Sequence, residues 1–340
     1  MEGGAEKVIV ALDAMGGDNA PQEVVKGGVM ALEESKDIYL KVCGTEEAVR
    51  RELAQYTYDE SRLEVVGCTE VIATDEHPVN AIRKKKDSSL VVCMNMVRKG
   101  EADALVTAGN SGAVLAGGQI VVGRLKGVER TPFSPLIPTT KGMSLLLDAG
   151  ANVDAKPSWL VQFAKMGSIY MENIVGVKNP RVGLVNIGAE EEKGNQLVKE
   201  TMPLLKECKN INFIGSVEAR DIPFGAADVI VCDAFVGNVI LKMYEGVGGA
   251  LFSEIKTGLM SSLRSKIGGL LIKPALKQTV KKFSTEEFGG APLLGCKGLV
   301  VKTHGSSKSK EIKNSILQCV QFKQQGISEK IQANLKEEEA

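Results

Sequence analysis

Five polar, glycine-containing segments, each directly after a short apolar run, hold the residue types with which this chain could bind an anion. They begin at Asp13, Gly109, Gly188, Asp233 and Lys302. Small side chains and free backbone N–H groups ahead of a helix suit phosphate, because a helix N-terminus carries partial positive charge. We therefore expect phosphate or substrate to contact Asp13, Gly16, Gly17, Asn110, Ser111, Gly112, Asn186, Gly188, Asp233, Gly305 and Ser306. Any one of these turns could equally close a strand, so the prediction rests on all five together.

Three residues of these segments are candidates for catalysis: His304, Lys193 and Asn238. The imidazole of His304, which precedes Gly-Ser-Ser, could take a proton from a phosphate nucleophile or orient it. Lys193 follows three glutamates and could stabilise a phosphate or an oxyanion. The alternatives are a helix-capping role for His304 and a simple ion pair for Lys193.

Common nucleotide, metal and hydrolase motifs are absent from the sequence. It contains no G-x-G-x-x-G after an apolar run, no Gly-Lys dipeptide and no G-x-S-x-G. The only histidines are His77 and His304, which excludes a histidine-rich metal centre. We expect no metal.

Composition excludes further classes of protein. The 42 Lys and Arg residues balance 42 Asp and Glu residues, and aromatic residues make up 4%. A chain without excess positive charge or stacking rings is a poor candidate for nucleic-acid binding. No apolar run is long enough to span a membrane, the N-terminus lacks a signal-peptide pattern, and the seven cysteines form no C-x-x-C pair. We expect a cytoplasmic protein.

Short apolar runs alternate with longer segments of helical pattern over most of the chain. The predicted strands are Val8–Leu12, Tyr39–Cys43, Leu63–Val66, Ala104–Thr107, Leu145–Asp148, Val182–Ile187, Asn212–Ile214, Val229–Cys232 and Leu299–Val301. Such alternation is typical of βαβ units and a mostly parallel sheet. Five glycine-containing segments would then share one rim at the carboxyl ends of the strands. We expect one large α/β domain over residues 1–335 and a frayed acidic tail at 336–340.

Two segments are strongly basic. Residues 254–283 hold seven basic residues and one acidic residue, with apolar residues four apart, and Gly268-Gly269 and Pro274 predict a helical hairpin. Its apolar tip would be Leu270, Leu271 and Ile272, flanked by Lys266 and Lys273. This hairpin suits either an anionic membrane surface or a dimer interface. Arg83, Lys84 and Lys85 form the other basic segment, which is either a solvated helix face or a contact for an acidic partner.

Several longer motifs resemble the PlsX family of bacterial phosphate acyltransferases of phospholipid synthesis. They are Ala-Leu-Asp13-Ala-Met-Gly16-Gly17-Asp18-Asn-Ala-Pro21, Ala-Ile-Arg83-Lys-Lys-Lys86-Asp87-Ser-Ser89, Thr-Ala-Gly109-Asn110-Ser-Gly112-Ala, Leu-Asp148-Ala-Gly150-Ala-Asn152-Val-Asp-Ala-Lys156-Pro157, Val-Glu218-Ala-Arg220-Asp221 and Lys-Thr-His304-Gly305-Ser-Ser307. The match extends from about Val8 to Gln321. It departs from the family at Ser111 and Val236, where the family more often has threonine.

The resemblance implies transfer of a fatty acyl group from acyl carrier protein to inorganic phosphate, giving acyl phosphate for a glycerol-3-phosphate acyltransferase. It also implies a homodimer that needs no organic cofactor and associates peripherally with the inner face of the plasma membrane. The implied fold is a Rossmann-like three-layer αβα sandwich, related to phosphotransacetylases and isocitrate-type dehydrogenases. Two alternatives stay open: a phosphotransacetylase that uses acyl-coenzyme A, and a non-catalytic membrane-surface scaffold that docks carrier protein.

Overall fold

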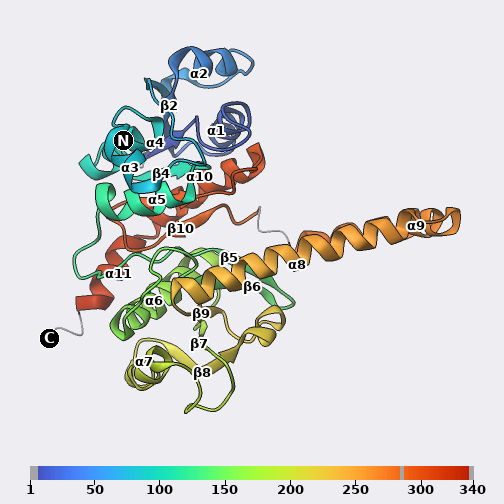
Figure 1. Ribbon diagram of the computed structural model, residues 1–340. Helices are drawn as coiled ribbons and strands as arrows, with labels where there is room; N and C mark the ends of the chain where they lie inside the picture. Colours follow the sequence, from blue (N-terminus) through green and yellow to red (C-terminus); the bar gives the residue numbers. More distant parts are fainter. Residues whose placement is uncertain (1–6, 284–286, 337–340) are drawn as a thin grey trace, which may run out of the picture.

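A computed structural model describes residues 7–283 and 287–336 and shows an α/β fold with two mostly parallel sheets (Figure 1). The first sheet has the order β10 (Ala291–Leu293), β11 (Leu299–Lys302), β4 (Ala104–Thr107), β1 (Val8–Asp13), β2 (Ile38–Gly44) and β3 (Leu63–Gly67). The second has the order β5 (Leu136–Thr139), β6 (Gly142–Leu147), β9 (Val229–Val231), β7 (Arg181–Asn186) and β8 (Asn212–Glu218). The α/β class is confirmed, but the strands form two sheets where the sequence suggested one.

Successive side chains of a strand point to opposite faces of its sheet, so each sheet has an apolar core on both faces. Val10 and Leu12 belong to a core on one face of β1, and Ala11 belongs to a separate core on the other face. In the second sheet, Leu145 shares the core of Val10, whereas Leu146 faces a third cluster. This follows from the two-residue period of a strand. One continuous core therefore joins the two sheets.

Helices cover both faces of the sheets. They are α1 (Gln22–Glu34), α2 (Glu46–Leu53), α3 (Pro78–Lys84), α4 (Ser89–Lys99), α5 (Ser111–Gly117), α6 (Pro157–Tyr170), α7 (Gln196–Glu207), α8 (Ala234–Met260), α9 (Leu263–Lys282), α10 (Ser309–Gln324) and α11 (Ile327–Lys336). Helices α1 and α10 pack together on one face of the first sheet, and α4 covers the other. In the second sheet, α6 and α7 lie on one face, and the first turns of α8 pack on the other. Apart from Lys336, which ends α11, the predicted acidic tail lies outside the described residues.

The basic hairpin turns at a different place from the one that the sequence suggested. Helix α8 starts between the sheets and projects far from the body, and α9 lies at its outer end (Figure 1). The chain turns at Ser261-Ser262, where the Ser262 hydroxyl accepts a hydrogen bond from the Ser265 N–H at 3.1 Å. Helix α9 then continues through Gly268-Gly269 and Pro274. The Ser262 cap fixes where α9 begins, and the interior glycines and proline lower the stability of the helix without ending it.

The three residues predicted to form the apolar tip therefore do not lie at the turn of the hairpin. Leu270, Leu271 and Ile272 lie within α9, and all three are exposed. A Cβ on Gly269 would lie 3.4 Å from Cδ2 of Leu259, so this part of α9 is folded back against the end of α8. Within the two described stretches of the chain, no helix has the length and apolar character to cross a membrane.

Candidate active site

Three of the five glycine-containing segments meet at the carboxyl ends of β1, β4 and β11. The Asp18 N–H donates a hydrogen bond to the Gly305 carbonyl at 2.8 Å, and the Asn19 side chain donates to the Ser306 carbonyl at 3.0 Å. Gly17 has a φ of +97°, and a Cβ there would lie 2.7 Å from that of Ala108. The strand order reverses between β1 and β4, and such a switch point is where α/β sheets bind ligands.

Asp13 is buried under the loop that follows β1 and does not face the solvent. Its buried carboxylate accepts hydrogen bonds from Ser89 Oγ and Thr107 Oγ1, each at 2.6 Å. Burial raises the pKa of this carboxyl, while the two hydroxyl donors act in the opposite direction. A Cβ on Gly16 would lie 2.6 Å from Oδ2 of Asp13, so the loop crosses directly over the carboxylate. The geometry favours a positioning role for Asp13 over direct contact with phosphate.

The side chain of Asn110 also forms its hydrogen bonds within the protein. Its Oδ1 accepts a hydrogen bond from the Ala113 N–H at 2.9 Å, which caps α5. Its Nδ2 donates to the carbonyls of Ala73, Thr74 and Glu76 at 2.9 to 3.2 Å. Gly112 lets α5 approach α3, since a Cβ there would lie 2.4 Å from Cγ of Pro78. These contacts fix the start of α5 and leave Ser111 exposed there.

A small polar cavity of about 170 Å³ lies where the two sheets meet. It is lined from the first sheet's side by Ser111, Lys302, Thr303, His304 and Glu311, and from α8 by Leu241, Lys242 and Glu245; Phe133, Pro135, Leu136 and residues 289–291 complete it. We call it the polar cavity. It combines two lysines, a histidine and the hydroxyls of Ser111 and Thr303, which are groups that bind an oxyanion, with two glutamates.

Lys302 is the most buried charged residue of this cavity, and the sequence reasoning selected neither it nor Lys242, Glu245 and Glu311. Its side chain is only 7% exposed, and its Nζ donates to the carbonyls of Thr303 and, at 3.4 Å, Ala108. Burial lowers the pKa of Lys302 to about 8. A lysine directly after the apolar run Leu-Val-Val was the signal that could have identified it, because an unpaired lysine is rarely buried.

His304 is exposed beside Lys302, and its hydrogen bonds fix the ring tautomer. Its Nδ1 accepts a hydrogen bond from the backbone N–H of Ser306 at 3.2 Å and lies 2.7 Å from that residue's Oγ. The neutral ring therefore carries its proton on Nε2. His304 can then donate a hydrogen bond from Nε2 to an oxygen in the cavity.

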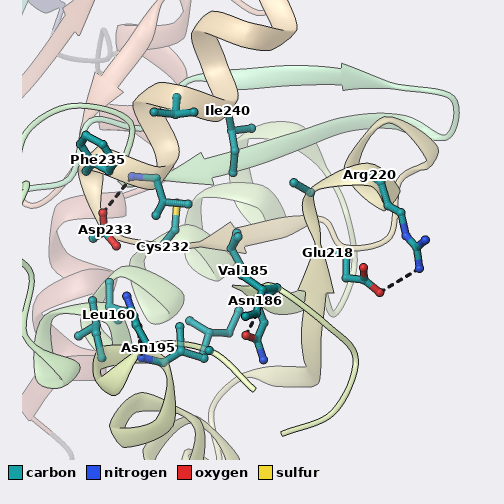
Figure 2. A pocket seen from close by; sticks show the side chains of 18 residues that line it. Leu160, Val185, Asn186, Asn195, Glu218, Arg220, Cys232, Asp233, Phe235 and Ile240 are labelled. Carbon is teal, nitrogen blue, oxygen red and sulfur yellow. Dashed lines mark hydrogen bonds and ion pairs between the residues drawn. The ribbon is translucent and has the colours of Figure 1, made fainter. Parts of the chain in front are cut away.

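The remaining two glycine-containing segments border another cavity, of about 570 Å³, at the ends of β7, β8 and β9 (Figure 2). We call it the apolar cavity; its lining is Leu160, Leu184, Val185, Asn186, Ile187, Gly194, Asn195, Leu197, Val198, Glu218, Ala219, Arg220, Cys232, Asp233, Phe235, Val236, Val239 and Ile240. The single rim expected from the sequence is therefore wrong, because the second sheet carries its own strand ends.

Ten of the predicted catalytic and phosphate-binding residues line neither cavity: Asp13, Gly16, Gly17, Asn110, Gly112, Gly188, Lys193, Asn238, Gly305 and Ser306. Lys193 forms an exposed ion pair with Glu190 at 2.8 Å, and this contact raises the pKa of Lys193. Gly188 lies beneath it, since a Cβ there would lie 2.6 Å from Cδ of Lys193. Asn238 donates a hydrogen bond to the Ala149 carbonyl at 3.1 Å. These contacts fit the ion-pair alternative for Lys193 and a positioning role for Asn238.

Comparison with known proteins decides the family. The model of a family described as "Fatty acid synthesis protein" matches residues 8–330. A phosphate acyltransferase of Clostridium acetobutylicum is 50% identical over 330 residues, 97% of this chain and 99% of the relative. One of Clostridium novyi is 49% identical over 96% of this chain and 98% of the relative. The chain belongs to the phosphate acyltransferase family. The predicted family, enzyme class and role in fatty acid and phospholipid synthesis are confirmed.

Solved structures show that the phosphate acyltransferase has the phosphotransacetylase fold. The EutD phosphotransacetylase of Staphylococcus aureus matches with a TM-score of 0.60, 16% identity and 94% coverage of both chains. A phosphotransacetylase of Streptococcus pyogenes matches with a TM-score of 0.61, 15% identity and the same coverage. The similarity at these identities is one of fold, and the predicted relation to phosphotransacetylases is confirmed.

A buried acid holds the start of α8 in this enzyme. Asp148 is fully buried and accepts hydrogen bonds from the N–H groups of Phe133, Gly150, Ala151 and Asn152 at 2.8 to 3.1 Å. The Asn152 carbonyl in turn accepts the Ala234 N–H at 3.0 Å. Asp233 Oδ1 caps α8 by accepting the Val236 N–H at 2.9 Å. Asp148 thus fixes the helix that both cavities share.

In the basic segment at the end of α3, one of the three basic residues pairs with an acidic side chain. Lys85 forms an ion pair with Glu76 at 2.6 Å, while Arg83 and Lys84 are exposed. Lys266 and Lys273 of α9 are exposed as well. Among the described residues, no group of three or more His, Cys, Asp and Glu side chains is placed to hold a metal ion.

Proposed function

We propose that this phosphate acyltransferase transfers a fatty acyl group from the thioester of acyl carrier protein to inorganic phosphate bound in the polar cavity. The observation that carries the proposal is the meeting of Lys302 and His304 with Lys242 of α8 in one small cavity. Lys302, Lys242 and the ring N–H of His304 offer positive charge and a hydrogen-bond donor to phosphate, and Glu245 and Glu311 line the same cavity. The product is an acyl phosphate, which a glycerol-3-phosphate acyltransferase would consume.

The reaction needs positioning and charge stabilisation more than strong acid catalysis. A phosphate oxygen attacks the thioester carbonyl carbon, and a carbon–oxygen bond forms as negative charge develops on the carbonyl oxygen. The tetrahedral intermediate then breaks its carbon–sulfur bond and releases the carrier's thiolate. Because a thiolate is stable near neutral pH, no strong general acid is required. Hydrogen-bond donors held in place for the developing oxyanion supply much of the rate.

Each group of the polar cavity has a role in this scheme. Lys302 and Lys242 hold the phosphate, and Nε2 of His304 donates a hydrogen bond to phosphate or to the developing oxyanion. Ser111, at the start of α5, offers a further hydroxyl. Glu245 pairs with Lys242 at 2.8 Å and keeps that side chain over the cavity. Lys302 takes the role that the sequence assigned to Lys193.

Exposed basic residues support a carrier protein as the donor. Acyl carrier proteins are acidic, and Arg83, Lys84, Lys266 and Lys273 offer positive charge to such a partner. The hairpin of α8 and α9 also carries exposed apolar residues, including Leu271 at 77% exposure. We propose that this hairpin serves a peripheral contact with an anionic membrane on the cytoplasmic side, a homodimer interface, or both.

Trapping of the product tests the proposed reaction. The purified enzyme is incubated with hexadecanoyl carrier protein and phosphate, and hydroxylamine converts acyl phosphate to a hydroxamate. We expect hydroxamate that depends on phosphate, and its loss in Lys302→Met and His304→Ala. A parallel reaction with hexadecanoyl- and acetyl-coenzyme A separates the alternative donor. Turnover of coenzyme A thioesters alone would overturn the assignment of carrier protein.

A further inference from the structure

The apolar cavity presents mainly apolar side chains to a ligand. Its floor is formed by Leu160 and Leu184, which are buried, and its sides by half-buried valines and isoleucine of α7, α8 and β7. Figure 2 shows Val185 and Ile240 pointing toward one another across this space. At its edge Phe235 is 65% exposed and Ile187 is 80% exposed. Apolar surface left open in this way gains free energy when an apolar ligand covers it.

The polar side chains around the cavity are engaged by the protein itself. Asn186 donates hydrogen bonds to Ser216 Oγ at 3.1 Å and to the Lys193 carbonyl at 3.2 Å. Asn195 caps α7 by accepting the Val198 N–H at 3.0 Å, and Arg220 pairs with Glu218 at 3.1 Å. Asp233 caps α8 in the same way. A polar ligand such as a nucleotide would find its partners already bonded, whereas a hydrocarbon chain requires none.

The apolar and polar cavities both border the first turns of α8. Phe235, Val236, Val239 and Ile240 line the apolar cavity, while Leu241, Lys242 and Glu245 line the polar one. At about 100° per residue, Val236 and Ile240 point away from Lys242 and Glu245, whereas Phe235 lies on the same side of the helix as Lys242. The same stretch of α8 therefore contributes to a site suited to phosphate and to a site suited to hydrocarbon, the two chemical parts of an acyl-transfer reaction.

We propose that the apolar cavity holds the fatty acyl chain of the substrate and sets the preferred chain length. This inference rests on the proposed function, because it assigns a second part of the same substrate. The size of the cavity limits how many methylene groups are removed from water. Each buried methylene contributes about 0.8 kcal/mol, or roughly a fourfold change in binding.

Bulky substitutions on two separate walls test the assignment. Val198→Phe and Val236→Phe narrow the cavity from α7 and from α8, and Val71→Phe is the matched control, since Val71 is exposed and lines neither cavity. Acyl phosphate formation is measured with butanoyl and hexadecanoyl carrier protein. We expect kcat/KM for the long donor to fall at least about tenfold in both cavity variants, which corresponds to two or more lost methylenes. The short donor and the control should stay within about twofold of the native enzyme.

A binding measurement separates this inference from the proposed reaction. Fluorescence of cis-parinaric acid reports chain binding without turnover, and we expect both cavity variants to lose it while Val71→Phe keeps it. If the native enzyme forms no acyl phosphate but the variants lose parinarate binding, the proposed reaction fails and the chain site stands. Equal loss for both donors, or unchanged parinarate binding with an altered oligomeric state, would overturn the chain site. The second result would assign the cavity to a contact between protein copies.

Discussion

Nδ1 of His304 accepts a hydrogen bond from the backbone N–H of Ser306 at 3.2 Å. Since a backbone N–H can only donate, this contact assigns the proton of the neutral imidazole to Nε2. The ring therefore offers a donor to the polar cavity, and its first role is to bind an oxygen. Ser306, in the short Gly-Ser-Ser sequence after the histidine, thus orients the ring.

The donor role of His304 predicts different results for two substitutions. His304→Gln can keep an N–H near the position of Nε2, whereas His304→Ala removes it. We expect the alanine variant to lose about 10²- to 10³-fold in kcat, the usual cost of one oxyanion donor. The glutamine variant should retain clearly more activity. Single-turnover hydroxamate trapping measures both, and equal rates in the alanine variant and the native enzyme would refute the role.

The pKa of Lys302, lowered by burial to about 8, predicts a pH dependence of phosphate use. Below this pKa the side chain is charged and attracts phosphate, and above it the charge is lost. We expect kcat/KM for phosphate to decline about tenfold per pH unit above about pH 8. Bound phosphate stabilises the charged lysine, so kcat should decline at a higher pH than kcat/KM.

Lys302→Arg is the control for this profile, because arginine keeps its charge at any pH that the enzyme survives. Whatever activity the variant retains should show no decline near pH 8. If the arginine variant and the native enzyme decline at the same pH, another group is responsible. Steady-state rates at varied phosphate between pH 6.5 and 9.5, a range chosen to bracket the pKa, make the comparison.

Alanine substitutions at two glycines with positive φ distinguish the cost of backbone strain from the cost of a steric clash. Gly17 has a φ of +97° and only 2.7 Å between an added Cβ and that of Ala108, whereas Gly100 has a φ of +75° and open space around it. Gly100→Ala should lower the free energy of unfolding by about 1 kcal/mol, the cost of the left-handed conformation. Gly17→Ala adds a steric clash, so we expect a larger loss of unfolding free energy than in Gly100→Ala, together with weaker phosphate binding. Urea unfolding of both variants measures the two losses, and similar losses would contradict the prediction.

Exposed leucine and isoleucine of α9 predict a role in membrane attachment. The double substitution Leu271→Glu with Ile272→Glu replaces two apolar side chains by negative charges, close in sequence to Lys266 and Lys273. We expect weaker cosedimentation with vesicles that contain anionic lipid, and unchanged turnover of soluble donor. Sedimentation velocity of the same variant gives the oligomeric state. Unchanged vesicle binding with a dissociated dimer would assign α9 to the dimer interface instead.

Local patterns in the sequence predicted most of the parallel strands closely. Ala104–Thr107 has the same bounds in the structure as in the prediction. It is set by a short-range feature, an apolar run. The two antiparallel strands β5 and β10 were missed because each contains a proline, Pro138 and Pro292, which argues against a central strand. Each pairs with one neighbour at the edge of its sheet, where a proline is tolerated.

The sequence by itself determined the α/β class, the enzyme family and the segments that carry chemistry, because turns, apolar runs and motifs are local. Only the tertiary structure decided which of those segments share a cavity. It placed Asp13 beneath the loops, Lys302 inside the polar cavity and Lys193 outside both cavities. Burial and neighbourhood depend on contacts between residues far apart in the chain, such as Asp13 with Thr107. No spacing along the sequence encodes that α8 borders both the polar and the apolar cavity.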